Sequence, residues 1–242
     1  MSDNVTRLVL IRHGESTWNA QNRFTGWVDV PLSPRGREDA RNAARLLGTH
    51  GIVIDVCFTS LLIRAIETAV ICLTEGEGVC AGRSPVLKHD ADDPQWHGWD
   101  RYEGEPAEEL PVYLSQALDE RYYGRLQGLN KRQTAERVGE EAVRQWRRSF
   151  SCRPPGGESL ADTAARTVPF LEGRIMSHLR AGNNTLVSAH GNSLRSIVMT
   201  LDDLGEDEVA GLEVATAVPM IYELDVHGRV LGKDLLDDCL DA

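Results

Sequence analysis

The chain has 242 residues, of which 41% are hydrophobic and 26% charged, and its formal net charge at pH 7 is −11. This length and composition are typical of one globular domain with a sizeable core. The negative charge makes nucleic acids and anionic membranes poor partners, and no apolar run is long enough to cross a membrane.

The cysteines and the N-terminal residues bear on the cellular compartment. The five cysteines form no CxxC pair, and the first ten residues, MSDNVTRLVL, lack the apolar stretch of a signal peptide. We therefore expect reduced thiols and a cytoplasmic location. If such an acidic protein handles an anionic small molecule, its positive charge must be concentrated locally.

The first half of the chain alternates between strand and helix signals. Arg7–Ile11 is a short apolar run rich in branched residues, which predicts a buried strand. Ser33 and Pro34 form an N-cap and first-turn pair, and an apolar stripe of period 3.6 follows. Val53–Phe58 predicts a second strand. The stripes lie at Ala40, Ala43, Ala44 and Leu47 for the first helix, which Gly48 ends, and at Ile66, Ala69, Val70 and Leu73 for the second.

The same alternation returns near the C-terminus. Leu186–Ala189 predicts a strand, Leu194–Leu204 a helix, and Met220–Leu224 a late strand. Alternating strands and helices favour an α/β fold with a mostly parallel central sheet flanked by helices on both faces. We expect a single domain over residues 1–242. Residues 74–112, rich in Gly, Pro and acidic side chains, predict an inserted loop or small subdomain.

Two predicted strands end in the same way, with a histidine followed by glycine. LVLI runs into Arg12-His13-Gly14, and LVSA runs into His190-Gly191. Ligands of open α/β sheets bind beyond the carboxyl ends of the strands. One neutral imidazole there can attack phosphorus, while a second, protonated imidazole donates to phosphoryl oxygens.

A cationic neighbour strengthens this interpretation. Arg12 beside the first histidine supplies a planar fork that matches two phosphate oxygens. A single His-Gly pair at a strand end is more often structural. The repeated pair, with an adjacent arginine, favours a phosphoryl-transfer site.

Longer motifs resemble a known family. RHGESTWN (12–19), RFTGW (23–27) and PLSPRG (31–36) are similar to the histidine phosphatase superfamily. ALDERYYGRLQGLNK (117–131), QWRRSF (145–150) and SAHGNSLRSIV (188–198) resemble, more specifically, the cofactor-dependent phosphoglycerate mutases.

The resemblance implies a role for each matching residue. His13 resembles the nucleophile that becomes phosphohistidine, and Glu120 resembles the acid/base that moves the substrate hydroxyl proton. The pocket around the transferred phosphoryl group would comprise Arg12, Arg64 and His190. Further phosphate or substrate contacts would come from Asn19, Thr25, Gly26, Gly191 and Asn192. The clamp on the substrate's carboxylate and second phosphate would comprise Tyr123, Lys131, Arg147 and Arg148.

The resemblance also implies an activity. We expect interconversion of 3-phosphoglycerate and 2-phosphoglycerate, with 2,3-bisphosphoglycerate as the priming phosphoryl donor and intermediate, and with no metal. The partners would be these small molecules, and a homo-oligomer is left open. Two alternatives stay open: a phosphatase of the same superfamily that acts on bisphosphoglycerate or another small ester, and a non-catalytic phospholigand-binding protein.

Three departures from the family pattern bear on the balance of mutase and phosphatase activity. Residues 74–112 are longer than their counterparts, the Pro/Gly loop at about 151–158 is shorter, and the chain ends in a short acidic tail.

The segment 74–112 offers a competing site. It holds a cluster that could ligate a metal: His89, Asp90, Asp92, Asp93 and His97. Acidic loops are far more often solvated turns, so we favour that interpretation. Trp18 and Trp27 are expected to be packing residues.

Overall fold

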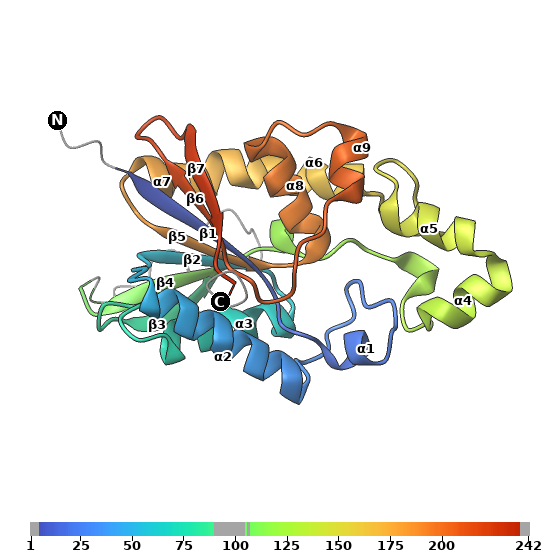
Figure 1. Cartoon of the computed structure of the whole chain (residues 1–242), viewed down its shortest axis with the longest axis horizontal. Helices are drawn as coiled ribbons and strands as arrows, with labels where there is room; N and C mark the ends of the chain where they lie inside the picture. Colours follow the sequence, from blue (N-terminus) through green and yellow to red (C-terminus); the bar gives the residue numbers. More distant parts are fainter. Residues whose placement is uncertain (1–4, 90–104, 106, 238–242) are drawn as a thin grey trace.

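A computed structural model describes residues 5–89, 105 and 107–237. In this part of the chain the core is a seven-stranded sheet with the order β3-β4-β2-β5-β1-β6-β7 (Figure 1). The strands are β1 (Thr6–Arg12), β2 (Val56–Thr59), β3 (Ser84–His89), β4 (Glu109–Leu114), β5 (Thr185–Ala189), β6 (Met220–Leu224) and β7 (Val230–Leu235).

The pairing of β1 with β5 determines where the two predicted histidines, His13 and His190, lie. The two strands are parallel and in register from Leu8 opposite Thr185 to Arg12 opposite Ala189. Both strands therefore end at the same edge of the sheet. β2, β3 and β4 continue the parallel part, whereas β6 and β7 add antiparallel strands beyond β1. The prediction of a mostly parallel sheet is confirmed.

Helices cover both faces of the sheet (Figure 1). One face carries α2 (Pro34–Thr49) and α3 (Ile63–Glu75), and the other carries α6 (Leu160–Phe170), α7 (Met176–Arg180) and α8 (Gly191–Leu201). The predicted stripe of α2 is fully buried, and the Gly36 amide donates to Ser33 Oγ over 3.0 Å as the N-cap requires. Two apolar clusters, one on each face, form the core.

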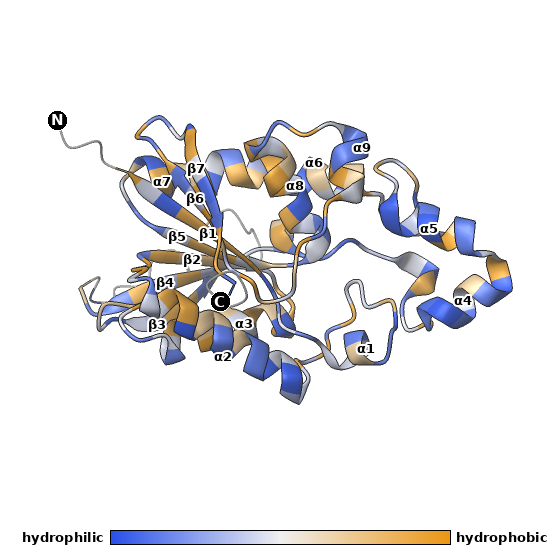
Figure 2. Ribbon diagram, viewed as in Figure 1, coloured by the Kyte–Doolittle hydropathy of each residue, from blue (hydrophilic) through white to orange (hydrophobic). Residues whose placement is uncertain are grey.

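A second group of helices lies away from the sheet. These are α1 (Thr17–Ala20), α4 (Lys131–Val138) and α5 (Glu140–Arg148), with the short α9 (Glu206–Gly211) near α8. Figure 1 shows that α4 and α5 project beyond the helices that cover the sheet. Figure 2 shows a largely hydrophilic α5, in contrast to the apolar strands. The buried side of α5 is narrow and centres on Val143.

The predicted insertion at 74–112 is in part core structure. Residues 84–89 form β3 at one edge of the sheet, and residues 109–112 belong to β4 beside it. Residues 90–104 and 106, between the strands, lie outside the described residues. The Pro/Gly loop at 151–158 packs under the 117–131 motif: the Arg125 amide donates to Pro155 O over 3.0 Å, and the Tyr122 amide to Glu158 Oε2 over 2.9 Å.

Several boundaries differ from the predictions. α8 begins at Gly191, three residues before the expected Leu194, because the strand end leads directly into the helix. β7 was not predicted; its exposed, mixed side chains give no clear alternation. Among the described residues, no helix is long and apolar enough to span a membrane.

Candidate active site

The two histidines meet at the end of β1 and β5. The backbone amide of His13 donates to Ala189 O over 3.0 Å, so the parallel register continues one residue beyond β1. The ring centroids of His13 and His190 are 4.9 Å apart, with an angle of 63° between the ring planes. Both side chains are buried, with exposed fractions of 3% and 0%. The structure thus brings together the pair that the sequence predicted.

Gly14 has a packing role. A Cβ atom at this position would lie 2.1 Å from Gly36 O, at the start of α2. Gly14 therefore allows close approach of a helix. At Gly191 a Cβ atom would meet only Arg12 at 3.7 Å and Glu120 at 4.0 Å, so this glycine leaves space between the two side chains.

The contacts of His13 fix its tautomer. Nδ1 lies 2.7 Å from Gly14 O, and because a carbonyl only accepts, Nδ1 carries the proton. Nε2 then has a free lone pair, which accepts from Arg64 Nε over 3.3 Å. Burial, followed by the charges of Arg64 and Arg12, holds the pKa of His13 well below its usual value. The imidazole is therefore neutral, and its unprotonated Nε2 can act as a nucleophile.

The second imidazole is also neutral. Burial, then the charge of Arg64 and the neighbouring ring of His13, holds the pKa of His190 well below its usual value. Ser60 Oγ lies 2.7 Å from His190 Nε2 and accepts from the Leu62 amide over 3.2 Å. A serine hydroxyl can both donate and accept, so this contact pairs Nε2 and leaves Nδ1 as the ring nitrogen without a hydrogen-bond partner in the described part of the chain. The ring is thus neutral in the free protein, in contrast to the protonated imidazole that we expected.

Two arginines, Arg64 and Arg12, lie around His13, and together with His190 they form the group of side chains that we call the cup. Arg64 is buried and donates to Val28 O over 3.0 Å and to Gly26 O over 2.8 Å, which fixes its plane. Burial lowers its pKa to about 10, so it stays charged at neutral pH. Arg12 donates from Nη1 to Val214 O over 2.9 Å, and its Nε has no hydrogen-bond partner within the described part of the chain.

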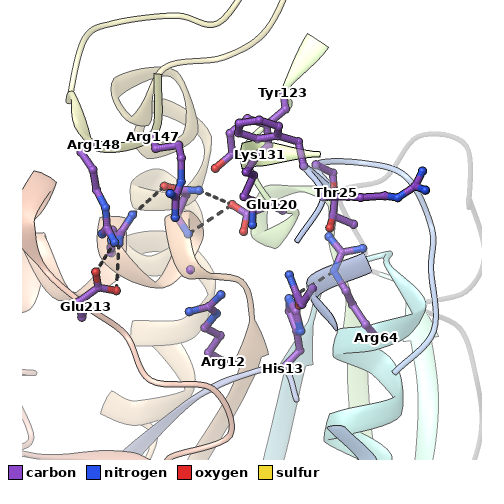
Figure 3. Close-up of a pocket in the computed structure, with 17 residues that line it drawn as sticks. Arg12, His13, Thr25, Arg64, Glu120, Tyr123, Lys131, Arg147, Arg148 and Glu213 are labelled. Atoms are coloured by element: carbon purple, nitrogen blue, oxygen red, sulfur yellow. Dashed lines mark hydrogen bonds and ion pairs between the residues drawn. The ribbon is translucent and has the colours of Figure 1, made fainter. Parts of the chain in front are cut away.

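Glu120 lies on the opposite wall of the pocket (Figure 3). Its Oε1 accepts from Asn192 Nδ2 over 2.6 Å, from the Asn192 amide over 3.3 Å and from the Arg121 amide over 2.7 Å. Burial raises the pKa of Glu120, but these hydrogen bonds and the charges of Arg121 and Arg64 outweigh it, and the pKa is lowered. The carboxylate is ionised and can accept a proton.

The predicted clamp lies around Glu120 in Figure 3, with Tyr123 and Lys131 above it and Arg147 and Arg148 to its left. It comprises Tyr123, Lys131, Arg147 and Arg148. Arg121, buried behind this wall, donates to the Tyr123 hydroxyl over 3.0 Å and to Arg147 O over 3.3 Å. Burial, together with the charges of Arg147 and Arg12, lowers the pKa of Lys131, although the Tyr123 and Glu120 side chains oppose the shift.

One pocket joins these groups. It encloses about 690 Å³, including the open solvent at its mouth. Every predicted site residue except His190 lines it, and His190 packs edge-on against the ring of His13. The cations on its wall are Arg12, Arg23, Arg64, Lys131, Arg147, Arg148 and Arg195. The lining carboxylates are Glu120 and Glu213, so the pocket is strongly positive in a chain of charge −11.

Sequence reasoning missed several members of the site. Arg195 lies one helical turn after Asn192 and donates to Asn192 Oδ1 over 3.2 Å, a spacing that could have identified it. Arg23 is the first residue of the RFTGW motif and lies over the Trp18 ring. Glu213 belongs to no motif. Trp27, expected to be a packing residue, also donates from Nε1 to Glu120 O over 2.6 Å.

The competing metal site finds no support in the described residues. No group of three or more His, Cys, Asp or Glu side chains there could hold a metal ion. His89 is the last residue of β3, and the other four candidates (Asp90, Asp92, Asp93 and His97) lie outside the described residues.

Comparison with known proteins decides the family. The model of the histidine phosphatase superfamily (branch 1) matches residues 8–85 and 103–233. A 2,3-bisphosphoglycerate-dependent phosphoglycerate mutase from Gloeothece citriformis is 59% identical over 232 residues, which cover 96% of this chain and 100% of that protein. The chain belongs to this mutase family.

Other relatives agree with this membership. The 2,3-bisphosphoglycerate-dependent phosphoglycerate mutase 1 of Gloeobacter violaceus is 57% identical, with 96% of this chain and 99% of that protein covered. Among solved structures, a mycobacterial glucosyl-3-phosphoglycerate phosphatase has a TM-score of 0.66 and 26% identity, covering 90% of this chain and 92% of that one. The mutase family therefore shares its fold with phosphatases.

Proposed function

We propose that this protein interconverts 3-phosphoglycerate and 2-phosphoglycerate through a phosphohistidine at position 13. One observation carries the proposal: the unprotonated Nε2 of buried His13 faces a cationic cup that also holds an ionised carboxylate, Glu120. A nucleophile, fixed positive charge and a proton acceptor are what transfer between two alcohols requires. The names of the closely similar mutases support the same substrates.

Unpartnered polar atoms support anion binding in the pocket. Buried atoms without a hydrogen-bond partner in the described part of the chain include Arg12 Nε, Thr25 Oγ1, His190 Nδ1 and Arg148 Nη1. Buried donors are rarely left unpaired, so these atoms fit a ligand rich in oxygen. We assign the transferred phosphoryl group to the cup formed by Arg12, Arg64 and His190. The substrate's carboxylate and second phosphate then contact the clamp.

The transfer steps follow from these assignments. The bond between phosphorus and His13 Nε2 breaks as a bond forms to O2 of 3-phosphoglycerate, and the hydroxyl proton passes to Glu120. In the return step the bond from phosphorus to O3 breaks, a bond to Nε2 forms, and Glu120 gives its proton to O3. The hydrogen bond from His13 Nδ1–H to Gly14 O supports the positive charge on the phosphorylated ring.

Both ends of the pocket are cationic, and this permits the ligand to exchange ends between the two steps. Asn19, Gly26, Gly191 and Asn192 also line the pocket. Gly191 leaves room for the ligand because it has no side chain. When bound, 2,3-bisphosphoglycerate supplies the phosphoryl group that first loads His13. A cytoplasmic location, a homo-oligomer and independence of metal stay predictions.

A single assay tests the proposed function. The purified protein is incubated with 3-phosphoglycerate, with and without a trace of 2,3-bisphosphoglycerate, and ³¹P NMR follows both monophosphoglycerates and inorganic phosphate. We expect 2-phosphoglycerate to form, faster with the bisphosphate and at the same rate with a chelator. Release of inorganic phosphate as the main product would support the phosphatase instead, and no turnover would support a binding protein.

A further inference from the structure

Glu213 is a carboxylate in the pocket that the proposed reaction does not use. It lies between α9 and β6, and 68% of its side chain is exposed. Its Oε1 forms an ion pair with Arg148 Nη2, and its Oε2 lies 3.9 Å from Arg195 Nη2. Figure 3 shows the Glu213 side chain directed at Arg148, on the Arg12 side of the pocket.

The backbone on both sides of Glu213 is held by arginines of the site. Leu212 O accepts from Arg195 Nε over 2.7 Å, and Val214 O accepts from Arg12 Nη1 over 2.9 Å. The Ala217 amide donates to Arg12 O over 2.9 Å. These bonds fix the Cα of Glu213 at the rim of the pocket. Its exposed side chain can still rotate into solvent without moving the backbone.

The charges that face Glu213 explain its position. Arg148 and Arg195 approach each other, and burial together with the charge of Arg148 lowers the pKa of Arg195 to about 10. The Glu213 carboxylate offsets this repulsion between like charges. Glu120, the other pocket carboxylate, is already engaged by Asn192. In the absence of substrate, Glu213 is therefore the carboxylate that pairs with Arg148.

We propose that Glu213 is an internal competitor for the clamp, displaced from Arg148 when the substrate's carboxylate or second phosphate binds. An anion that engages the whole Arg148 fork must take over Nη2, which Glu213 occupies in the free protein. The competition weakens the binding of any anion that must displace Glu213 from this atom. This inference rests on the proposed function and assigns Glu213 a part in setting the affinity for the substrate.

The variant Glu213→Gln tests the inference, because it removes the charge and keeps the shape. We expect the dissociation constant for 3-phosphoglycerate, measured by titration calorimetry, to fall by about two- to fivefold, the size expected for an exposed ion pair. In turnover assays we expect a lower KM. Orthovanadate binds at the His13 end of the pocket, so its affinity should change less than that of 3-phosphoglycerate.

Glu38→Gln is the matched control. Glu38 is also exposed and paired with an arginine, Arg41, but it lies on α2 away from the pocket, and its variant should bind as the wild type does. Weaker or unchanged binding of 3-phosphoglycerate by Glu213→Gln would overturn the inference, weaker binding indicating that Glu213 positions Arg148. If the wild type itself fails to bind 3-phosphoglycerate, the proposed function fails instead.

Discussion

Ser60 Oγ lies 2.7 Å from His190 Nε2, and this buried contact leaves Nδ1 as the unpartnered nitrogen of the second imidazole within the described part of the chain. We predict that the Ser60 hydroxyl donates to Nε2, so that Nδ1 carries the proton and is a donor that needs no positive charge on the ring. That matters because burial disfavours an imidazolium, and the charges of Arg64, Arg12 and Arg166 disfavour it further. A neutral His190 can therefore donate to a phosphoryl group in the same pocket as a neutral His13.

Removing the Ser60 hydroxyl should impair phosphoryl transfer. In Ser60→Ala the Nδ1–H tautomer is no longer favoured, and we expect kcat to fall by about ten- to a hundredfold, less than the loss of a complete oxyanion donor. The ¹⁵N chemical shifts of His190 should change toward a mixture of tautomers. Ser188→Ala, which removes another buried hydroxyl that bonds Ala65 O instead of an imidazole, is the control. Unchanged His190 shifts in Ser60→Ala would contradict this account.

The buried histidines should make stability depend on pH. Their pKa values are lowered in the folded protein, so below the usual value of 6.5 the unfolded chain binds more protons. The free energy of unfolding should therefore decrease as the pH falls below about 6.5, by up to about 1.4 kcal/mol per pH unit for each histidine.

The comparison with His190→Asn isolates this contribution. Asp119, whose pKa burial raises to about 6, acts in the opposite direction but is present in both proteins. Urea denaturation between pH 7.5 and pH 5 should show a steeper loss of stability in the wild type. Parallel curves for the two proteins would show that His190 is not held neutral.

The two glycines that follow the histidines should respond differently to alanine. Gly14→Ala forces a Cβ onto the backbone of Gly36, and we expect destabilisation of about 1–3 kcal/mol or more. Gly191→Ala meets only ordinary contacts at the start of α8, so its stability should change by less than about 1 kcal/mol, in either direction. Its methyl group points toward Arg12 and Glu120 and should raise KM. Denaturation midpoints together with KM values for both variants distinguish the two roles.

The Glu120 carboxylate should be needed for proton transfer. Glu120→Gln keeps an oxygen that can accept from Asn192 but cannot hold the substrate proton. We expect kcat for the interconversion to fall by about 10²- to 10⁴-fold, the usual contribution of a general acid/base. A fall of less than tenfold would assign proton transfer to another group.

The sequence predicted those elements whose side chains bury one face or both. β1 and β6 are nearly continuous apolar runs, and α2 has a stripe of period 3.6, so their positions follow from hydrophobic burial alone. β3 and β4 carry Pro85 and Pro111 and lie at one side of the sheet, where their pairing depends on β2. Local pattern holds no information about such pairing.

The site residues that lie in sequence motifs could be predicted, and the others could not. His13, His190 and Glu120 lie in motifs that the sequence displays, and the fold brings them to one edge of the sheet. Ser60 and Glu213 act through tertiary contacts over 130 and 65 residues of chain, to His190 and Arg148 respectively. No spacing rule relates residues so far apart.

The phosphohistidine is the central claim, and direct labelling tests it most simply. The protein is incubated with ³²P-labelled 2,3-bisphosphoglycerate, quenched, digested and mapped. We predict one acid-labile label, on His13, that chases into 2-phosphoglycerate when unlabelled 3-phosphoglycerate is added and that is absent from His13→Asn. A label on another residue, or interconversion by His13→Asn at the wild-type rate, would contradict the account.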